Sequence, residues 1–130
     1  AEKHMVFPEI ISKEPLGPLV RQGDDQWADI GRWVLNALIV GEEMGITKAN
    51  VATMSSGTKN PEINRLLGTE GSIAKWLGLD PKWAMRAISV NGNYAEIFEK
   101  YIGKNTPLGL ARGQNALYNK GGILYAPPVR

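Results

Sequence analysis

The stretch Asp25-Gln-Trp-Ala-Asp-Ile-Gly-Arg-Trp-Val-Leu-Asn-Ala-Leu-Ile-Val-Gly-Glu-Glu-Met44 holds the longest helical pattern of the sequence and decides which fold the chain can adopt. Asp24 or Asp25 can cap the start of a helix here, and Gly45 can end it in a left-handed conformation. Apolar residues recur at helical spacing, and residues 33–40 are apolar nearly all round. We therefore expect a helix over residues 25–44 that is buried on more than one side.

Short apolar pairs precede this helix, and prolines separate them. The pairs are Val6-Phe7, Ile10-Ile11 and Leu19-Val20. Because proline cannot donate to a β ladder, we expect edge or crossover strands within residues 6–21. These fragments are too few and too interrupted to form a stable sheet alone. Their partners could come from a longer parent chain, from a second copy, or from the helices if the fragments are loops.

Shorter helical segments are expected after the first helix. Asn60-Pro61-Glu62 combines an N-cap, a proline at the first helical position and an acid in the first turn. Tyr94, Ile97, Phe98 and Tyr101 form an apolar stripe that we expect in the core. The segments lie at 47–54, 60–67, 72–77, 80–88, 94–102 and 106–117. With no repeat or internal linker, residues 1–130 read as a single domain, with the strands at 6–21 and mainly helix over 25–130.

Composition excludes several classes of protein. The 130 residues include 43% hydrophobic and 22% charged residues, which is typical of one soluble globular domain. A net charge of +2, evenly spread, argues against a nucleic-acid partner. With no cysteine and only His4 as histidine, a metal site and thiol or histidine catalysis are not expected. We expect no cofactor and no metal ligand.

Catalytic patterns are weak. Glu42–Glu43 lie at a helix end and Glu96–Glu99 lie opposite an apolar stripe, so we expect solvated carboxylates rather than an acid and base pair. The segment 68–71 lacks the lysine and serine that follow a phosphate-binding loop. Ser55–Ser56 have no histidine to activate them. The chain is predicted not to be an enzyme, with no catalytic residue.

Tryptophans and one amide could instead mark a ligand site. Trp27 and Trp33 point about 120° apart on a helix, which excludes a shared stacking face. Core packing is the expectation for Trp76 and Trp83 as well. Asn36, within the apolar run, is expected to make a structural hydrogen bond.

The residues as a series resemble the C-terminal part of the periplasmic general L-amino-acid-binding proteins of ABC importers. The stretch Phe7-Pro-Glu-Ile-Ile-Ser-Lys-Glu-Pro-Leu-Gly-Pro-Leu-Val-Arg-Gln-Gly-Asp-Asp-Gln-Trp27 is similar to the segment by which these proteins return from the second lobe to the first. The resemblance continues in order through Asn60-Pro-Glu-Ile-Asn-Arg-Leu-Leu-Gly68, Gly92-Asn-Tyr-Ala-Glu-Ile-Phe-Glu99, Thr106-Pro-Leu-Gly-Leu110, Arg112-Gly-Gln-Asn-Ala-Leu117 and Gly121-Gly-Ile-Leu-Tyr-Ala-Pro-Pro-Val-Arg130.

The resemblance implies an α/β fold: the helix-rich C-terminal part of a periplasmic-binding-protein-like lobe, with few short strands completed by missing segments or by a second copy. It implies capture of an L-amino acid between two lobes, delivery to a membrane permease, and a periplasmic location, although this sequence carries no signal peptide. The hinge or interface residues that it implies are Pro8, Glu9, Ile10, Ile11, Leu19 and Val20.

The sequence departs from the family pattern because only about the last third of the family is represented. The segments that bind the carboxylate and the ammonium of the ligand have no counterpart here, so the ligand-binding residues are unknown. Two other hypotheses remain: a truncated, self-associating module that does not bind amino acids, and, less favoured, a small helical hydrolase. For the isolated chain we expect a two-fold homodimer built around residues 6–21.

Overall fold

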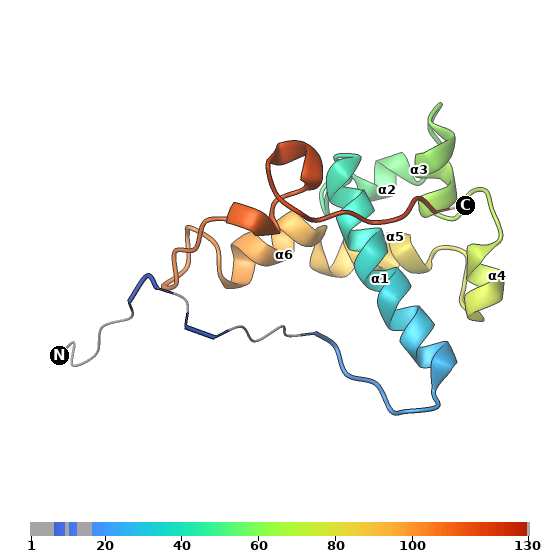
Figure 1. Ribbon diagram of the computed structural model, residues 1–130. Coiled ribbons are helices and arrows are strands. Elements are labelled where there is room, and N and C mark those ends of the chain that lie inside the picture. Colours follow the sequence, from blue (N-terminus) through green and yellow to red (C-terminus); the bar gives the residue numbers. More distant parts are fainter. Residues whose placement is uncertain (1–6, 10, 13–16, 130) are drawn as a thin grey trace.

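The computed structural model describes residues 7–9, 11–12 and 17–129, and within them the chain is helical (Figure 1). The α-helices are α1 (Asp25–Glu43), α2 (Val51–Met54), α3 (Pro61–Leu66), α4 (Ile73–Leu77), α5 (Trp83–Asn91) and α6 (Tyr94–Tyr101), and the 3-10 helices are η1 (Gly113–Asn115) and η2 (Tyr118–Lys120). Over these residues β-pairing is limited to one isolated parallel bridge between Leu117 and Leu124.

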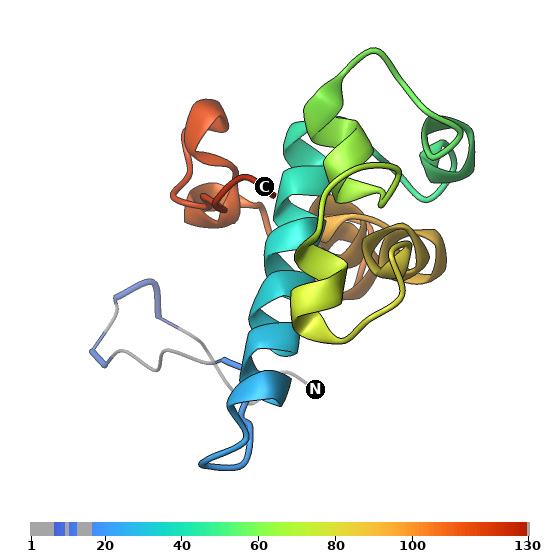
Figure 2. The same cartoon turned by 90° about the vertical axis from the view of Figure 1, so that its right-hand side faces the viewer.

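Helix α1 is the central element, as the sequence predicts. The carboxylate of Asp24 accepts from the Trp27 N–H at 3.1 Å and caps the helix start. Met44 is the C-cap, and Gly45 follows with φ +67°, a conformation that glycine adopts without strain. Helices α4, α5 and α6 pack against α1, and α2 packs against α5 (Figures 1 and 2).

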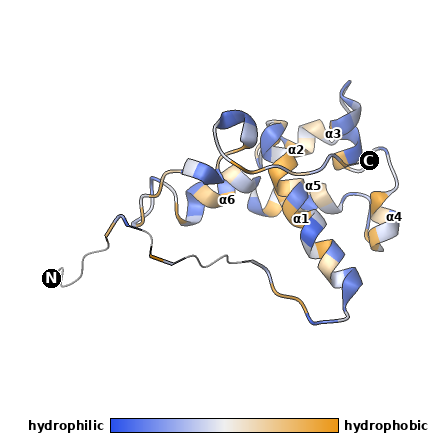
Figure 3. Ribbon diagram, in the orientation of Figure 1, coloured by the Kyte–Doolittle hydropathy of each residue, from blue (hydrophilic) through white to orange (hydrophobic). Residues whose placement is uncertain are grey.

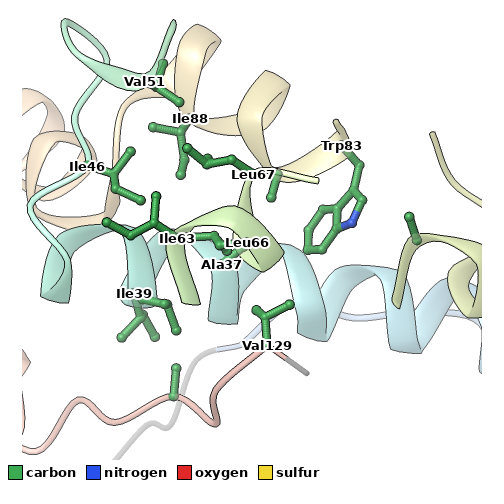
Figure 4. Close-up of a cluster of buried hydrophobic side chains, with 14 of the residues drawn as sticks. Ala37, Ile39, Ile46, Val51, Ile63, Leu66, Leu67, Trp83, Ile88 and Val129 are labelled. Carbon is green, nitrogen blue, oxygen red and sulfur yellow. The ribbon is translucent and has the colours of Figure 1, made fainter. Parts of the chain in front are cut away.

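The core forms where these helices meet (Figure 4). Hydrophobic and hydrophilic residues alternate along the ribbon of α1 (Figure 3), and its buried residues are Ala37, Ile39, Val40, Gly41 and Glu42. The buried members of the core are Ala37, Ile39, Val40, Ile46, Val51, Ile63, Leu66, Leu67, Ala74, Leu77, Trp83, Ala84, Ile88, Leu117, Ala126 and Val129. The helices after residue 24 therefore have an apolar core of their own.

Side-chain caps fix where two of the short helices, α3 and α6, begin. The Asn60 side chain accepts from the Glu62 N–H at 2.9 Å at the start of α3, which confirms the predicted signal. Asn93 and Glu96 form a reciprocal capping box at the start of α6. Such caps matter because intrinsic helix propensity alone gives little stability to helices of six and eight residues, the lengths of α3 and α6.

The C-terminal segment runs as a strap over α1 (Figures 1 and 4). We call residues 121–129 the tail. Ala126 and Val129 of the tail are 4% exposed and join the core cluster that contains Ile39. Ile123 and Tyr125 of the tail are exposed. The tail thus covers one face of the C-terminal half of α1.

The expected helix over 106–117 is wrong. Residues 104–112 form turns and irregular backbone, and only η1 and η2 follow. Gly109 (φ +60°) and Gly113 (φ +49°) adopt positive φ angles, which interrupt a right-handed helix. The prediction rested on Thr106-Pro107 as a helix start signal, and such a signal does not reveal the conformation of the glycines that follow it.

Three side chains also differ from expectation. Trp76 is 80% exposed because the five-residue α4 directs Ala74 and Leu77 to the core instead, whereas Trp83 is buried as predicted. Tyr101, at the end of α6, is 61% exposed. Asn36 is half-buried, and among the described residues its side chain forms no hydrogen bond.

Candidate functional site: an exposed arm beside helix α1

The residues singled out as hinge or interface candidates lie on an exposed arm. We use "arm" for the described residues between Phe7 and Gly23, which lead away from the start of α1 (Figures 1 and 2). Pro8 and Glu9 are exposed, and Ile11 is 97% exposed. The Ile10 candidate lies outside the described residues. The expected strands are therefore not paired in this part of the chain.

Leu19 and Val20 are the candidates closest to the helices. Leu19 is 97% exposed and Val20 is 40% exposed. Val20 borders a groove of about 310 Å³ between the arm and α1. The groove is lined mainly by apolar atoms, from Pro18, Val20, Ala28, Gly31, Arg32 and Leu35. Sequence reasoning identified the arm side of this groove but not the side formed by α1.

The α1 side of the groove is one stripe of the helix. Ala28, Gly31, Arg32 and Leu35 follow helical spacing, and Leu35 is 38% exposed. Farther along α1 the Ile39 side chain points toward the tail and is 5% exposed (Figure 4). The same helix is therefore covered by the tail at its C-terminal half and open along the groove at its N-terminal half. We call this open stripe the bare face of α1.

The two carboxylates at the end of α1 are not simply solvated, contrary to the prediction. Glu42 is 8% exposed, and its Oε2 accepts from Arg112 Nη2 at 2.9 Å. The Arg112 guanidinium lies 5.4 Å and 5.2 Å from the ring centres of Tyr94 and Phe98, respectively, and also donates to the Asn115 carbonyl at 2.7 Å. Arg112 thus offsets the cost of a carboxylate at a helix C-terminus and ties the irregular segment after α6 to α1.

Glu43 binds the segment that contains η2. Its Oε1 accepts a hydrogen bond of 3.0 Å from the Tyr118 hydroxyl, and Tyr118 packs edge-on against Tyr125 at 5.4 Å. The hydrogen bond to the Glu43 carboxylate, followed by the charge of that carboxylate, raises the pKa of the Tyr118 hydroxyl above 10.0. Adjacent carboxylates of α1 therefore anchor two successive segments near the C-terminus.

The Glu96–Glu99 pair also has structural roles. Glu96 Oε2 accepts from the backbone N–H of Asn93 at 2.8 Å and from that of Lys48 at 3.0 Å. Glu99 Oε2 accepts from the Lys104 N–H at 3.3 Å. These carboxylates bind backbone donors, which explains why acidic residues lie opposite the apolar stripe of α6.

Other kinds of site are not formed by the part of the chain that the structure describes. The aspartate and glutamate side chains of the described residues gather in no group that could hold a metal ion. Among the described residues, every helix is too short or too polar to cross a membrane. An exposed apolar arm beside an open helix face has the chemistry of an interface.

No family model matches the chain. It is 57% identical over 126 residues to the glutamate/glutamine/aspartate/asparagine-binding protein BztA of Rhodobacter capsulatus, covering 97% of this chain and 37% of BztA. It is 59% identical over 131 residues to the general L-amino acid-binding periplasmic protein AapJ of Rhizobium johnstonii. This match covers 99% of this chain and 38% of AapJ. The putative amino-acid ABC transporter-binding protein YhdW of Escherichia coli K12 is 54% identical to this chain. This match covers 97% of this chain and 37% of YhdW.

A solved structure gives the same result in three dimensions. An ABC transporter periplasmic binding protein from Brucella ovis, with glutathione bound, matches this chain with a TM-score of 0.90 and 56% sequence identity. The match covers 95% of this chain and 39% of the Brucella chain. By sequence and by structure, the chain is therefore similar to a part of proteins that are named as amino-acid-binding or ABC transporter-binding proteins. The similarity is to the C-terminal portion of these relatives, and the chain spans a little over a third of their length.

Proposed function

We propose that this chain serves as the C-terminal part of the amino-acid-binding component of an ABC importer. In this role it acts in the periplasm, and the assembled protein captures a free L-amino acid by lobe closure and delivers it to a membrane permease. The observation that carries the proposal is the match over 97–99% of this chain, at 54–59% identity, to proteins named for amino-acid binding.

The finer expectations about the fold belong to the same proposal. The arm would supply strands to an α/β lobe whose other strands come from the rest of such a protein. Pro8, Glu9, Ile10 and Ile11 would form the hinge strand, and Leu19 and Val20 the strand after it. Support comes from the exposed arm, where Ile11 and Leu19 are each 97% exposed, although both are apolar.

Uptake of labelled amino acids tests the transport role. In a chimera, this chain replaces the matched segment of the Rhizobium relative, and the chimera is expressed in a strain that lacks its own copy of that relative. We expect uptake of L-amino acids to be restored. A chimera that accumulates in the periplasm but restores no uptake would contradict the proposal.

Self-association is a second candidate role for the isolated chain. The favouring observation is again the exposed apolar arm, because a two-fold pair of arms would cover side chains such as Ile11 and Leu19. Analytical ultracentrifugation at several concentrations measures this directly. A dimer that Ile10→Lys with Leu19→Lys dissociates would support self-association, and a single 14.2 kDa species at high micromolar concentration would refute it.

A further inference from the structure

We propose that Asn91 is a deamidation site that the junction between α5 and α6 keeps unreactive, and that the isoaspartyl product prevents this junction from closing again. The junction runs from Asn91, the last residue of α5, to Asn93, the N-cap of α6. The contacts to which we assign this control lie within residues 46–96, so the site does not depend on the proposed transport function.

An asparagine followed by glycine is the sequence in which deamidation is fastest, and Asn91-Gly92 is the one such pair in the 130 residues. The reaction begins when the backbone nitrogen of the following residue attacks the side-chain carbon, and glycine has no Cβ to hinder that attack. Glycine is also required here by the fold. Gly92 has φ +85°, and a Cβ on it would lie 2.7 Å from the Cβ of Glu96. The fold therefore keeps glycine next to Asn91, and with it the reactive pair.

The chemistry needs no reactant besides water. The Gly92 nitrogen bonds to Asn91 Cγ and gives up its proton, the side-chain nitrogen takes up that proton and leaves as ammonia, and a succinimide ring forms. Water then opens the ring at either carbonyl carbon. Breaking the bond to Cγ gives aspartate with the original backbone. Breaking the bond to the main-chain carbon gives isoaspartate, whose backbone is longer by the Cβ carbon.

The folded junction opposes the first step in two ways. The Gly92 N–H donates to the Ile88 carbonyl at 2.7 Å, so the attacking nitrogen is engaged and its peptide plane is fixed. Asn91 has helical backbone, in which side chains lean toward the helix N-terminus, and its Nδ2 donates to the Ala87 carbonyl at 3.3 Å. The side-chain carbon is thus directed toward the preceding turn and away from the nitrogen that must attack it.

Contacts with the loop that follows α1 hold the junction closed. Asn93 is 4% exposed, and its Nδ2 donates to the Ile46 carbonyl at 2.8 Å. Glu96 Oε2 accepts from the N–H of Asn93 at 2.8 Å and from that of Lys48 at 3.0 Å. Because these bonds restrain the backbone that must turn before the nitrogen can attack, the rate of deamidation depends on how often the junction opens.

The isoaspartyl product does not fit the closed junction. Its additional backbone carbon moves the Gly92 N–H away from the Ile88 carbonyl, and Gly92 is buried, without room for even a Cβ beside Glu96. The new carboxylate also lies at the C-terminus of α5, where negative charge is unfavourable. A chain that reacts while the junction is open is therefore kept open, and this irreversible step sets a lifetime rather than an equilibrium.

Ageing of the 130-residue chain at neutral pH, folded in buffer and unfolded in urea, tests whether the fold keeps the site unreactive. Digestion and mass spectrometry measure the conversion of Asn91, and methylation by an isoaspartyl methyltransferase measures the isoaspartate. We expect Asn91 to react roughly tenfold or more slowly in the folded chain than in the unfolded chain. Equal rates in the two samples, or no conversion in either, would overturn the proposal.

Asn93→Ala tests whether the junction controls the reaction. Loss of the cap and of the bond to the Ile46 carbonyl should raise the rate at Asn91 in the folded chain by about tenfold. Asn60→Ala is the matched control, since it removes the same kind of cap from α3, and it should leave the rate unchanged. If Asn93→Ala does not fold, Lys48→Met, which loses an exposed hydrogen bond to the end of α5, should raise the rate by about threefold. A folded variant of the junction that reacts at the wild-type rate overturns the proposal.

Hydrogen exchange of the aged chain tests the effect of the product. Chains aged in urea are returned to buffer and separated by chromatography into isoaspartyl and unmodified forms. The amides of residues 92, 93 and 96 should lose protection by roughly tenfold or more in the isoaspartyl form. Asn91→Asp should retain most of this protection, because it adds the same charge without lengthening the backbone. Protection in the isoaspartyl form equal to that of the unmodified chain would overturn the proposal.

Discussion

Phe98 connects the predicted apolar stripe of α6 to a contact that the sequence did not reveal. It is 6% exposed, and the Arg112 guanidinium lies 5.2 Å from the centre of its ring. Phe98→Ala should lower the free energy of unfolding by about 3 to 5 kcal/mol, through lost burial and a cavity. Thermal or urea melts measure the change. Tyr101→Ala, on the exposed end of the same helix, is the control and should stay within about 0.5 kcal/mol.

The buried pair of Glu42 and Arg112 should behave differently when one or both partners are removed. Arg112→Met leaves the Glu42 carboxylate buried without its cation, and we expect a loss of about 3 kcal/mol. Adding Glu42→Leu removes that uncompensated charge and should recover much of the loss. A double-mutant cycle in urea measures the coupling, and simple addition of the two single effects would contradict the arrangement.

Tyr118 should titrate at a higher pH than an ordinary tyrosine. The hydrogen bond to the Glu43 carboxylate stabilises the neutral hydroxyl, so the pKa of Tyr118 is raised in the folded chain. Because the folded-state pKa is the higher one, this contribution to stability is present below pH of about 10 and is lost as the pH rises through the raised value. Carbon-13 NMR of the Tyr118 ring follows the titration.

Glu43→Gln should move the pKa of Tyr118 back toward its ordinary value. Glu62→Gln is the matched control, since Glu62 lines the same small hollow without bonding the hydroxyl. An equal titration in wild type and Glu43→Gln would show that the contact is absent in solution.

At the scale of elements, two glycines of α1 should respond oppositely to alanine. A Cβ at Gly31 meets no atom within 4 Å, so Gly31→Ala should stabilise the helix by about 0.5 to 1 kcal/mol. At Gly41 the added Cβ would lie 3.0 Å from Ile88 Cδ1 in the core. We expect Gly41→Ala to gain nothing or to destabilise, because a packed core accommodates an extra methyl poorly. Equal melting temperatures for the two variants would contradict the packing of α1 on α5.

Local signals in the sequence were sufficient to locate most helices. Asp24 and Asn60 each bind the backbone at a predicted helix start, and such caps can be recognised because they act over two or three residues. The segment 106–117 could not be predicted in the same way, because its path depends on positive φ angles at Gly109 and Gly113 and on an arginine that reaches Glu42, far away in sequence.

At the scale of the whole molecule, the sequence predicted strands within residues 6–21, where the described residues form an exposed arm, and it did not predict the surface beside them. Leu19 and Val20 could be identified from proline punctuation and from resemblance. The bare face of α1 could not, because Ala28 and Leu35 are open only where the tail does not reach, and the path of the tail is a tertiary property. The carboxylates of Glu42 and Glu43 were misjudged as solvated for the same reason.

Isothermal titration of the chimera with a mixture of common L-amino acids tests the central claim most directly, with the isolated 130-residue chain measured beside it. An amino acid needs partners for both its carboxylate and its ammonium, buried between two lobes. The account predicts heat of tight binding, at micromolar affinity or better, for the chimera and none for the isolated chain. A folded chimera that releases no heat, or a tight site on the isolated chain alone, would contradict it.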